Sequence, residues 1–587
     1  MRSCDTRIAR NVCGSSSKSN DLSPGVRCQS YCDPAGGGRR TDGVSSSPLP
    51  TSKRSFTALG ALAGVVAALV ALGVAELIAG LSRSWRSPVI DVGDRVIDNV
   101  PPFVKDFAIE TFGTNDKPAL LIGIGVTLLL YAAVIGAVSF RWRIEVGLAG
   151  IGLFGLIGAA AAASNRAGGS LDDALPAIVG SIAGATALWS IHRVARPLIA
   201  QKPIGAERDS VGDEPTIESP TDPARATRRD LLVRTGSLVA VLALVGTGAG
   251  AVGRTIRSRF SAAESRMKVA LPKASNALAP IPSGVSVDVD GVATFVTSNR
   301  DFYRIDTALL VPQVPTEGYQ LRVTGMVDRQ LDLSFEDLLR RNVVEHDITL
   351  TCVSNTIGGE LIGNARWLGV RLDELLAEAG VQPGATQVVG RSIDGYTCGF
   401  PIEAATDGRN ALVAFGMNGE PLPLEHGFPV RLIVPGLYGY ISATKWLTEI
   451  ELTTFEDFEQ YWVPRGYADR APIKLMSRID SVDGLGTLRR QADGTAAIGG
   501  VAWAQTRGIS GVEVQIDDGA WEPCEMGDAL NDDTWRQWAY RWTPAGTGRV
   551  SIRCRAIDGS GMIQTDERSE PLPDGASGHH QIVVFVE

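Results

Sequence analysis

The chain is poor in the residues that most often bind metals, with five histidines and eight cysteines among its 587 residues. Four of the cysteines lie in the N-terminal tail, where Cys28 and Cys32 have no second metal-ligating pair beside them. No zinc site is therefore expected there. The other four cysteines are too few, in a chain of this length, to form a disulfide scaffold.

Two further absences exclude whole classes of function. The net charge is −9 and the second half of the chain has no basic stripe, which excludes nucleic-acid binding. His192, beside Arg193, is the only histidine within the apolar part of the chain. One histidine cannot supply the paired axial ligands of a membrane haem, so no haem is expected in this chain.

Long apolar runs are what the first half of the chain has in abundance. Most of them approach the ~20 residues that cross a bilayer as a helix. They predict five transmembrane helices within residues 55–255, after a disordered cytoplasmic tail at 1–54. The runs are Phe56–Leu81, Pro118–Phe140, Val146–Ser164, Pro176–Ile191 and Leu231–Val252.

Basic residues on the flanks of these runs predict their orientation. Lys53 and Arg54 precede the first run, Arg141 and Arg143 join the second to the third, and further arginines lie in the loop 193–230. The positive-inside rule places all three groups in the cytoplasm. With five crossings, everything after about residue 255 is extracytoplasmic, which predicts a multi-pass protein of the cytoplasmic membrane.

The apolar region leaves alternatives open. Arg228–Leu232 resembles a twin-arginine export signal, although ordinary positive-inside charge explains the same residues. The runs carry few charges and no evident inverted repeat, so we expect an anchor in the lipid bilayer rather than a transporter. Glu76, near the outer end of the first run, is expected to be solvated or paired.

The composition changes after the last apolar run. Residues 256–285 are interpreted as a linker, and residues 286–464 as a folded domain of short strands with few helices. The best helix candidates are Leu333–Arg341 and Leu372–Ala379, with Ser334 and Asp373 as the expected caps.

The last part, residues 465–587, has the pattern of an antiparallel sandwich in which Gly and Asp turns separate β-type runs. Cys524 and Cys554 lie in this part, and a disulfide and a reduced buried pair are equally compatible with the sequence. The predicted strands are Ala497–Ala502, Val512–Ile516, Trp535–Trp542, Val550–Ile557 and Gln581–Val586.

Cys352 is the residue with the most chemical potential. It stands in the run Leu350–Asn355, and glycines and Trp367 follow it closely. A thiolate is a strong soft ligand for a redox metal, whereas a lone cysteine is more often a buried structural thiol. Taken by itself the residue favours the structural role, so its neighbours decide the matter.

Six motifs at matching intervals shift this balance toward a metal ligand. Together they resemble the sulfite oxidase family of molybdenum enzymes across residues 286–587. The resemblance implies a multi-domain protein: an α+β molybdopterin domain at 286–464 and an all-β immunoglobulin-like dimerisation domain at 465–587. The five-helix anchor looks like the arrangement in actinobacterial membrane-bound members. The motifs are Phe302–Pro312, Leu350–Val370, Phe415–Pro423, His426–Gly436, Gly439–Leu447, and Trp503 with Arg507 and Trp535–Trp538.

The resemblance also assigns roles to single residues. Cys352 is implied as the protein ligand of molybdenum, beside the dithiolene sulfurs of one pterin, whose phosphate needs basic and hydroxyl partners. Catalytic roles are implied for Cys352, Arg304, Tyr396 and Arg507, the last as an anion contact. Cofactor contacts are implied for Tyr303, Arg304, Asp394, Thr397, His426, Arg431, Ser442 and Lys445.

Two departures from the family pattern concern the substrate. The family has an arginine five residues after the metal cysteine, where this chain has Ile357, preceded by Thr356. Asp306 replaces a histidine that the family places two residues after Arg304. Both changes remove positive charge, so the sequence predicts weak binding of sulfite, a dianion.

The sequence thus predicts a membrane-anchored molybdenum oxidoreductase that transfers an oxygen atom, with two electrons, to or from a small substrate such as a sulfur compound. The chain has no haem domain and no second redox motif, so a separate electron donor or acceptor protein is expected. The resemblance implies homodimers through the last domain. The alternative is a catalytically idle extracellular binding module on the same fold.

Overall fold

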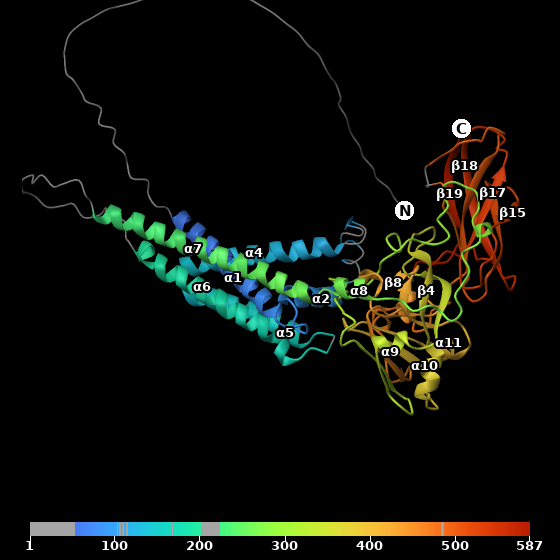
Figure 1. Cartoon of the computed structure of the whole chain (residues 1–587). Coiled ribbons are helices and arrows are strands. Elements are labelled where there is room, and N and C mark those ends of the chain that lie inside the picture. The colour runs from blue at the N-terminus through green and yellow to red at the C-terminus, as the bar shows by residue number, and fades with distance from the viewer. Residues whose placement is uncertain are drawn as a thin grey trace, which may run out of the picture. The chain divides into compact units, whose positions relative to one another are not determined.

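The computed structural model describes residues 53–587, except 102–103, 105–106, 108–110, 113–115, 167, 201–222 and 483–485. The predicted tail, with Cys28 and Cys32, and most of the predicted cytoplasmic loop lie outside the described residues. Figure 1 shows a helical part formed by the first half of the described chain and a β-rich part formed by the second.

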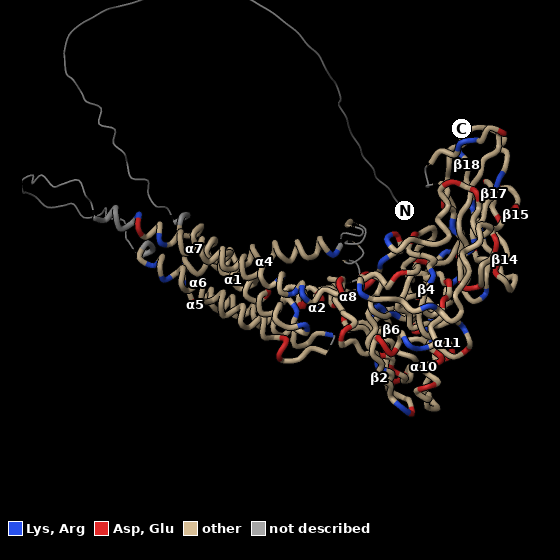
Figure 2. Tube along the Cα trace, viewed as in Figure 1, with Lys and Arg blue, Asp and Glu red and all other residues tan. Residues whose placement is uncertain are grey.

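Five helices of the first part are long and apolar enough to cross a membrane, and they confirm the five predicted runs as helices. Figure 2 shows that charges gather toward the ends of these helices and leave their middle stretches without Lys, Arg, Asp or Glu. The helices are α1 (Lys53–Ala79), α4 (Asp116–Arg141), α5 (Ile144–Ala163), α6 (Leu175–Ala200) and α7 (Pro223–Arg257).

Small residues bring these helices together. A Cβ added to Gly64 of α1 would lie 1.9 Å from the carbonyl oxygen of Ala132 in α4, and one added to Gly73 would lie 1.9 Å from that of Gly246 in α7. Glycine at such points lets two helix backbones approach closely, which is the main source of packing between helices in an apolar solvent. Any larger residue at Gly64 or Gly73 would push the pair apart.

Short elements cap the helical part on the side where the chain enters the β-rich part. Helix α2 (Pro88–Asn99) was not predicted. It begins with proline in its first turn, and Asp91 and Asp94 on one of its faces are buried against Arg86, with Arg86 Nη2 2.6 Å from Asp94 Oδ2. Glu76 accepts a hydrogen bond from Ser87, so it is paired, as expected. The remaining short elements are η2 (Leu171–Ala174), η3 (Ser258–Phe260) and α8 (Ala262–Lys268).

Two sheets form the first β-rich unit and share one apolar core. In the first sheet β1 is parallel to β10 and the other pairs are antiparallel; its order is β2 (Leu331–Ser334), β1 (Gln320–Gly325), β10 (Leu447–Thr453), β5 (Gln387–Ser392) and β6 (Thr397–Pro401). The second is antiparallel, with β3 (Val343–Thr351), β4 (Ile362–Arg371), β7 (Leu412–Met417) and β8 (Glu420–Pro421) in order, and β9 (Arg431–Ile433) beside β7.

Helices in this unit are short, as the sequence predicts. Helix α10 spans Leu372–Ala379, the predicted range, but Arg371 is its N-cap residue. The prediction that Asp373 caps it is wrong, because Asp373 lies inside the first turn, where it accepts hydrogen bonds from Arg371. Ser334 does cap α9 (Phe335–Leu339), in a capping box with Asp337. The other helices are η4 (Ser283–Val285), α11 (Glu403–Thr406), η5 (Leu424–His426), α12 (Gly439–Ser442) and η6 (Val463–Arg465).

The C-terminal region is built almost entirely of strands, which enclose a second core. One sheet has the order β11 (Met476–Ile479), β13 (Ala496–Trp503), β17 (Arg536–Trp542) and β16 (Glu525–Met526). The other has the order β12 (Thr487–Leu488), β19 (His580–Val586), β18 (Gly548–Asp558), β14 (Ile509–Ile516) and β15 (Trp521–Pro523). All five predicted strands are present. Cys524 and Cys554 are both free thiols, which decides between the two alternatives that the sequence left open.

Candidate active site

Cys352 lies at the start of the turn that joins β3 to β4. Its backbone N–H donates to the carbonyl of Leu361 at 2.9 Å, and its own carbonyl accepts from Asn355 at 3.1 Å, which closes the turn behind it. The residue is 7% exposed. Burial raises the pKa of the Cys352 thiol, so the protein alone keeps the sulfur protonated. A bound metal would reverse this, since a coordinating thiol is deprotonated.

Three tyrosines lie around this thiol. Burial raises the pKa values of Tyr303, Tyr396 and Tyr438, and the charge of a Cys352 thiolate adds to the rise in each case. Tyr396 donates its hydroxyl hydrogen to the carbonyl of Tyr440 at 2.6 Å. The three phenols therefore stay protonated at neutral pH, and the hydroxyl hydrogen of Tyr396 is donated to Tyr440.

Arg431 is a buried cation without an acidic partner among the described residues. It is 5% exposed, and its guanidinium donates to the carbonyls of His426 at 3.0 Å and Ala443 at 3.4 Å while its central carbon lies 5.1 Å from the centre of the Trp367 ring. Within the described part of the chain, no carboxylate comes within ion-pair distance of it. Burial lowers its pKa to about 10, which still leaves it charged at neutral pH. A buried, unpaired cation is costly, so a bound anion would stabilise it.

His426 lies beside Arg431 and is held neutral. Burial lowers its pKa to about 4. Its Nε2 lies 2.8 Å from the carbonyl oxygen of Asn299, an arrangement in which Nε2 carries the hydrogen and Nδ1 remains an acceptor. Ser442 is fully buried in the same region and donates to the carbonyl of Tyr438 at 3.0 Å.

Lys445 and Asp306 form the charged centre of the site. Lys445 Nζ lies 2.8 Å from Asp306 Oδ2, and burial lowers the pKa of Lys445 to about 8. Asp306 is 4% exposed at its side chain and also receives Arg304 Nε at 2.8 Å and Lys117 Nζ at 2.7 Å. Burial raises the pKa of Asp306, but the charges of Lys445, Lys117 and Arg304 together hold it well below its usual range. The carboxylate is therefore ionised, and the positive charge around it exceeds its own negative charge.

Asp394, Tyr396 and Thr397 come from the hairpin between β5 and β6. Gly395 has a φ of 80°, which makes the turn tight. Asp394 Oδ1 accepts from the backbone N–H of Tyr396 at 3.0 Å, which orients the tyrosine. Thr397 Oγ1 accepts from the backbone N–H of Tyr461 at 3.1 Å.

The structure thus brings most of the candidate residues into one neighbourhood. Arg507 is the exception: its Nε lies 3.1 Å from Asp558 Oδ2 in the C-terminal region, and none of its contacts is with another candidate. In the described ranges no three His, Cys, Asp or Glu side chains gather to form a metal site. A metal at Cys352 would therefore take most of its ligands from a non-protein group. A buried thiol beside buried, uncompensated cations fits a metal carried by an anionic organic cofactor.

Sequence reasoning missed four residues that contact the candidates. Lys117 and Arg166 stand at the ends of membrane-type helices, Asp98 lies on α2, and Tyr461 follows the first sheet. The two cations lie just outside apolar runs that were interpreted as an anchor, and neither was singled out. The signal available was the series Asp91, Asp94 and Asp98, whose spacing places three carboxylates on one helical face.

Comparison with known proteins places the chain. Residues 308–462 match the family model for the oxidoreductase molybdopterin binding domain. The sulfite oxidase of Gallus gallus is 30% identical over 323 residues, which cover 46% of this chain and 68% of that protein. The chain belongs to the sulfite oxidase family. The mitochondrial sulfite oxidase of Rattus norvegicus is also 30% identical, over 319 residues.

The chain spans little more than half the length of the mitochondrial relatives that it matches. The match spans 58% of the length of the rat protein and 46% of this chain. Among solved structures, the sulfane dehydrogenase SoxCD from Paracoccus pantotrophus aligns with a TM-score of 0.41 and 23% identity, over 46% of this chain and 75% of that one.

Proposed function

We propose that this member of the sulfite oxidase family is a membrane-anchored molybdenum oxidoreductase that transfers an oxygen atom to or from a small sulfur compound. One observation carries the proposal: the buried thiol of Cys352 and the buried cation of Arg431 both act on Tyr303, and no carboxylate within the described residues neutralises Arg431. A thiol for a soft metal and a charge for a phosphate are the two things that a molybdopterin cofactor needs from its protein.

The residues divide the work of holding this cofactor. Cys352 would bind the metal as a thiolate, and Arg431, Lys445 and Ser442 would hold the phosphate, with neutral His426 as a further cofactor contact. The remaining cofactor contacts are assigned to Tyr303, Arg304, Asp394 and Thr397. When bound, the cofactor would supply two-electron oxygen-atom transfer: the oxygen comes from water or is released as water with two protons, and the two electrons pass to or from the separate electron-transfer protein.

Tyr303 and Tyr396 would act on the substrate as hydrogen-bond donors, Tyr396 by exchanging the carbonyl of Tyr440 for the substrate. Tyr396 and Tyr303 keep their protons because burial raises their pKa values. The hydrogen bond from Tyr396 to the carbonyl of Tyr440 fixes the orientation of the ring in the substrate-free protein. Exclusion of water by this buried, aromatic surrounding would strengthen any polar contact that the substrate makes.

The substrate proposal rests on the charges at the two departures from the family. Asp306 adds no net negative charge to the site, since three cations surround it. Ile357 and Thr356 remain where the family has positive charge. We therefore propose a sulfur compound with less charge than sulfite, such as a thioether or its sulfoxide. Arg507 is proposed as an anion contact only if its ion pair with Asp558 opens.

The membrane proposal rests on the helices and their ends. Lys117 and Arg166 stand at helix ends that the positive-inside rule places outside, and both contact the domain that carries Cys352. An extracytoplasmic site on the cytoplasmic membrane is consistent with that pairing. A separate electron-transfer protein and an immunoglobulin-like C-terminal domain that forms homodimers complete the proposal.

Elemental and pterin analysis of the full chain, made in a host that synthesises molybdopterin, tests the function. We expect one molybdenum and one pterin for each chain, and turnover of sulfoxides or thioethers with an artificial electron carrier. Cys352→Ser should remove this turnover while the fold remains. Protein without molybdenum would support a binding module instead, and rapid turnover of sulfite would overturn the substrate proposal.

A further inference from the structure

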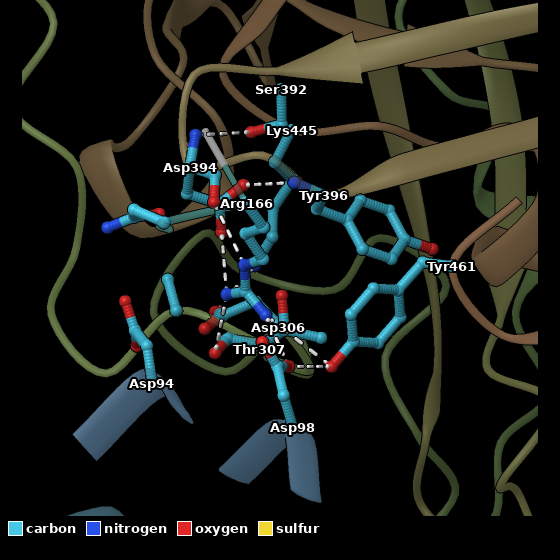
Figure 3. A network of polar contacts seen from close by, with 12 residues as sticks. Asp94, Asp98, Arg166, Asp306, Thr307, Ser392, Asp394, Tyr396, Lys445 and Tyr461 are labelled. Atoms are coloured by element: carbon cyan, nitrogen blue, oxygen red, sulfur yellow. Dashed lines mark hydrogen bonds and ion pairs between the residues drawn. The ribbon is translucent and has the colours of Figure 1, made fainter. Parts of the chain in front are cut away.

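The helical part contacts the domain that carries Cys352, and these contacts lie at the candidate site. Figure 3 shows Arg166, from the loop between α5 and η2, reaching between Asp98 of α2 and the backbone around Thr307 and Asp394. We name these contacts the docking network; its members are Asp98, Arg166, Thr307, Asp394 and Tyr461. All of them lie within one compact unit of the chain.

Arg166 uses its whole guanidinium group in the docking network. Its Nε donates to the carbonyl of Asp394 at 3.0 Å, its Nη1 to Asp98 Oδ1 at 3.0 Å, and its Nη2 to the carbonyl of Thr307 at 3.3 Å. Its side chain is 12% exposed. Burial lowers the pKa of Arg166, but the charges of Asp394 and Asp98 outweigh burial and raise it overall. The cation is therefore permanent and shared by three segments.

Two of these segments carry candidate site residues. Asp394 Oδ2 lies 3.8 Å from Arg166 Nη2, while its Oδ1 orients Tyr396. Thr307 follows Asp306, the carboxylate that binds Lys445. One guanidinium thus ties the turn of Tyr396 to the segment of Asp306. Only arginine has a planar group with enough donors to do this.

Tyr461 connects the same network to Tyr396 by a second route. Its hydroxyl donates to Asp98 Oδ1 at 2.7 Å, and its ring lies 5.6 Å from that of Tyr396, centre to centre. The Arg166 guanidinium lies 5.4 Å from the centre of the Tyr461 ring. Asp98, on the helical side, therefore holds both Arg166 and Tyr461 in place.

We propose that Arg166 is a positioning residue for the reaction: from the helical part, it fixes the Ser392–Tyr396 turn and the Asp306–Thr307 segment, and so sets the placement of Tyr396 at the site. The proposal rests on the proposed function, because it gives the helical part a role in that reaction beyond anchoring. Loss of the contacts would displace Tyr396 without removing any group that touches the cofactor.

Arg166→Gln in the full-length holoenzyme, reconstituted in lipid nanodiscs, tests the proposal. We expect molybdenum for each chain to stay at the wild-type level, and turnover for each bound molybdenum to fall roughly 10- to 100-fold, as displacements of about 1 Å at a reactive group do. Amide hydrogen exchange should become faster in residues 392–397 and 306–308 and stay unchanged in β18. Wild-type turnover and wild-type exchange would overturn the proposal.

Two further variants separate positioning from a simple ion pair. Arg166→Lys keeps the charge but cannot span three segments, so it should restore thermal stability and leave turnover low; full recovery of turnover would also overturn the proposal. Asp98→Asn should change exchange in the same direction by less, and it replaces Arg166→Gln if that variant does not fold. Arg143→Gln is the matched control, since Arg143 also joins two helices but is 76% exposed.

The exchange measurement keeps this proposal apart from the proposed function. It reads the docking network in protein with or without the cofactor. If wild-type protein holds no molybdenum, the proposed function fails. Unchanged exchange in residues 392–397 of Arg166→Gln would then still overturn the positioning role.

Discussion

Two buried arginines, Arg166 and Arg431, contact segments of the candidate site and differ in their partners. Arg166 has two carboxylates, Asp98 and Asp394, whereas the partners of Arg431 are backbone carbonyls and the face of Trp367. A buried guanidinium with carboxylates is satisfied by the protein and holds segments together. One without them is satisfied only when an anion arrives. The same residue type thus connects segments of the protein in one place and lines a proposed ligand site in the other.

Replacement of Arg431 should have the largest effect, and the effect should be on cofactor binding. Arg431→Met removes the charge and keeps much of the volume, so we expect cofactor affinity to fall roughly 10- to 100-fold, the value of one or two charged hydrogen bonds. The cofactor-free protein should be no less stable, and up to about 1–4 kcal/mol more stable, because an unpaired buried charge is gone. Pterin content and denaturant unfolding of the cofactor-free protein measure the two effects.

Arg166→Met should give the opposite result for stability. It leaves Asp394 without an ion-pair partner among the described residues and Asp98 with only Arg465, at 3.6 Å, which we expect to destabilise the cofactor-free protein by about 2–4 kcal/mol. A double-mutant cycle with Asp98→Asn should give a coupling energy of about 1–3 kcal/mol. If Arg431→Met and Arg166→Met change stability equally, partners do not distinguish the two arginines.

The pH dependence of stability should sharpen the description of the Arg431 side. Burial lowers the pKa of His426 to about 4, below its unfolded value of 6.5. Its contribution is therefore fully present above pH 6.5 and is lost as the pH falls toward 4, by at most about 3 kcal/mol. His580 has a similar pKa, so the test is the difference between wild type and His426→Gln in melting temperature from pH 7 to 4. A difference independent of pH would show that His426 is not held neutral.

Much of the fold could be predicted from patterns among residues that are close together in the sequence. The bounds of α10 follow from the spacing of Leu372, Leu375, Leu376 and Ala379, all buried on one face. The five apolar helices and the C-terminal strands were predictable for the same reason, since each depends on a pattern within one short stretch of sequence. Ser334 was recognisable as a cap because its partner Asp337 lies three residues away.

Contacts between distant segments could not be predicted in this way. Asp306 was expected to add negative charge to a substrate pocket. Instead its carboxylate is buried and forms ion pairs with Lys445 and with Lys117, which lies 189 residues earlier. The family resemblance carries no information about that pairing, because the helical part is not common to the family. Helix α2 was missed because its polar face is turned inward onto Arg86 and Arg166, the reverse of an ordinary surface helix.

The order of the docking network along the chain has a consequence for biosynthesis. Asp98 and Arg166 are translated long before Thr307, Asp394 and Tyr461. The first two can therefore pair as soon as α2 and α5 have formed. The surface onto which the later domain docks then exists before that domain has been translated. The contacts of Arg166 with Asp394 and Thr307, which join the two parts, are then among the last of the docking network to form.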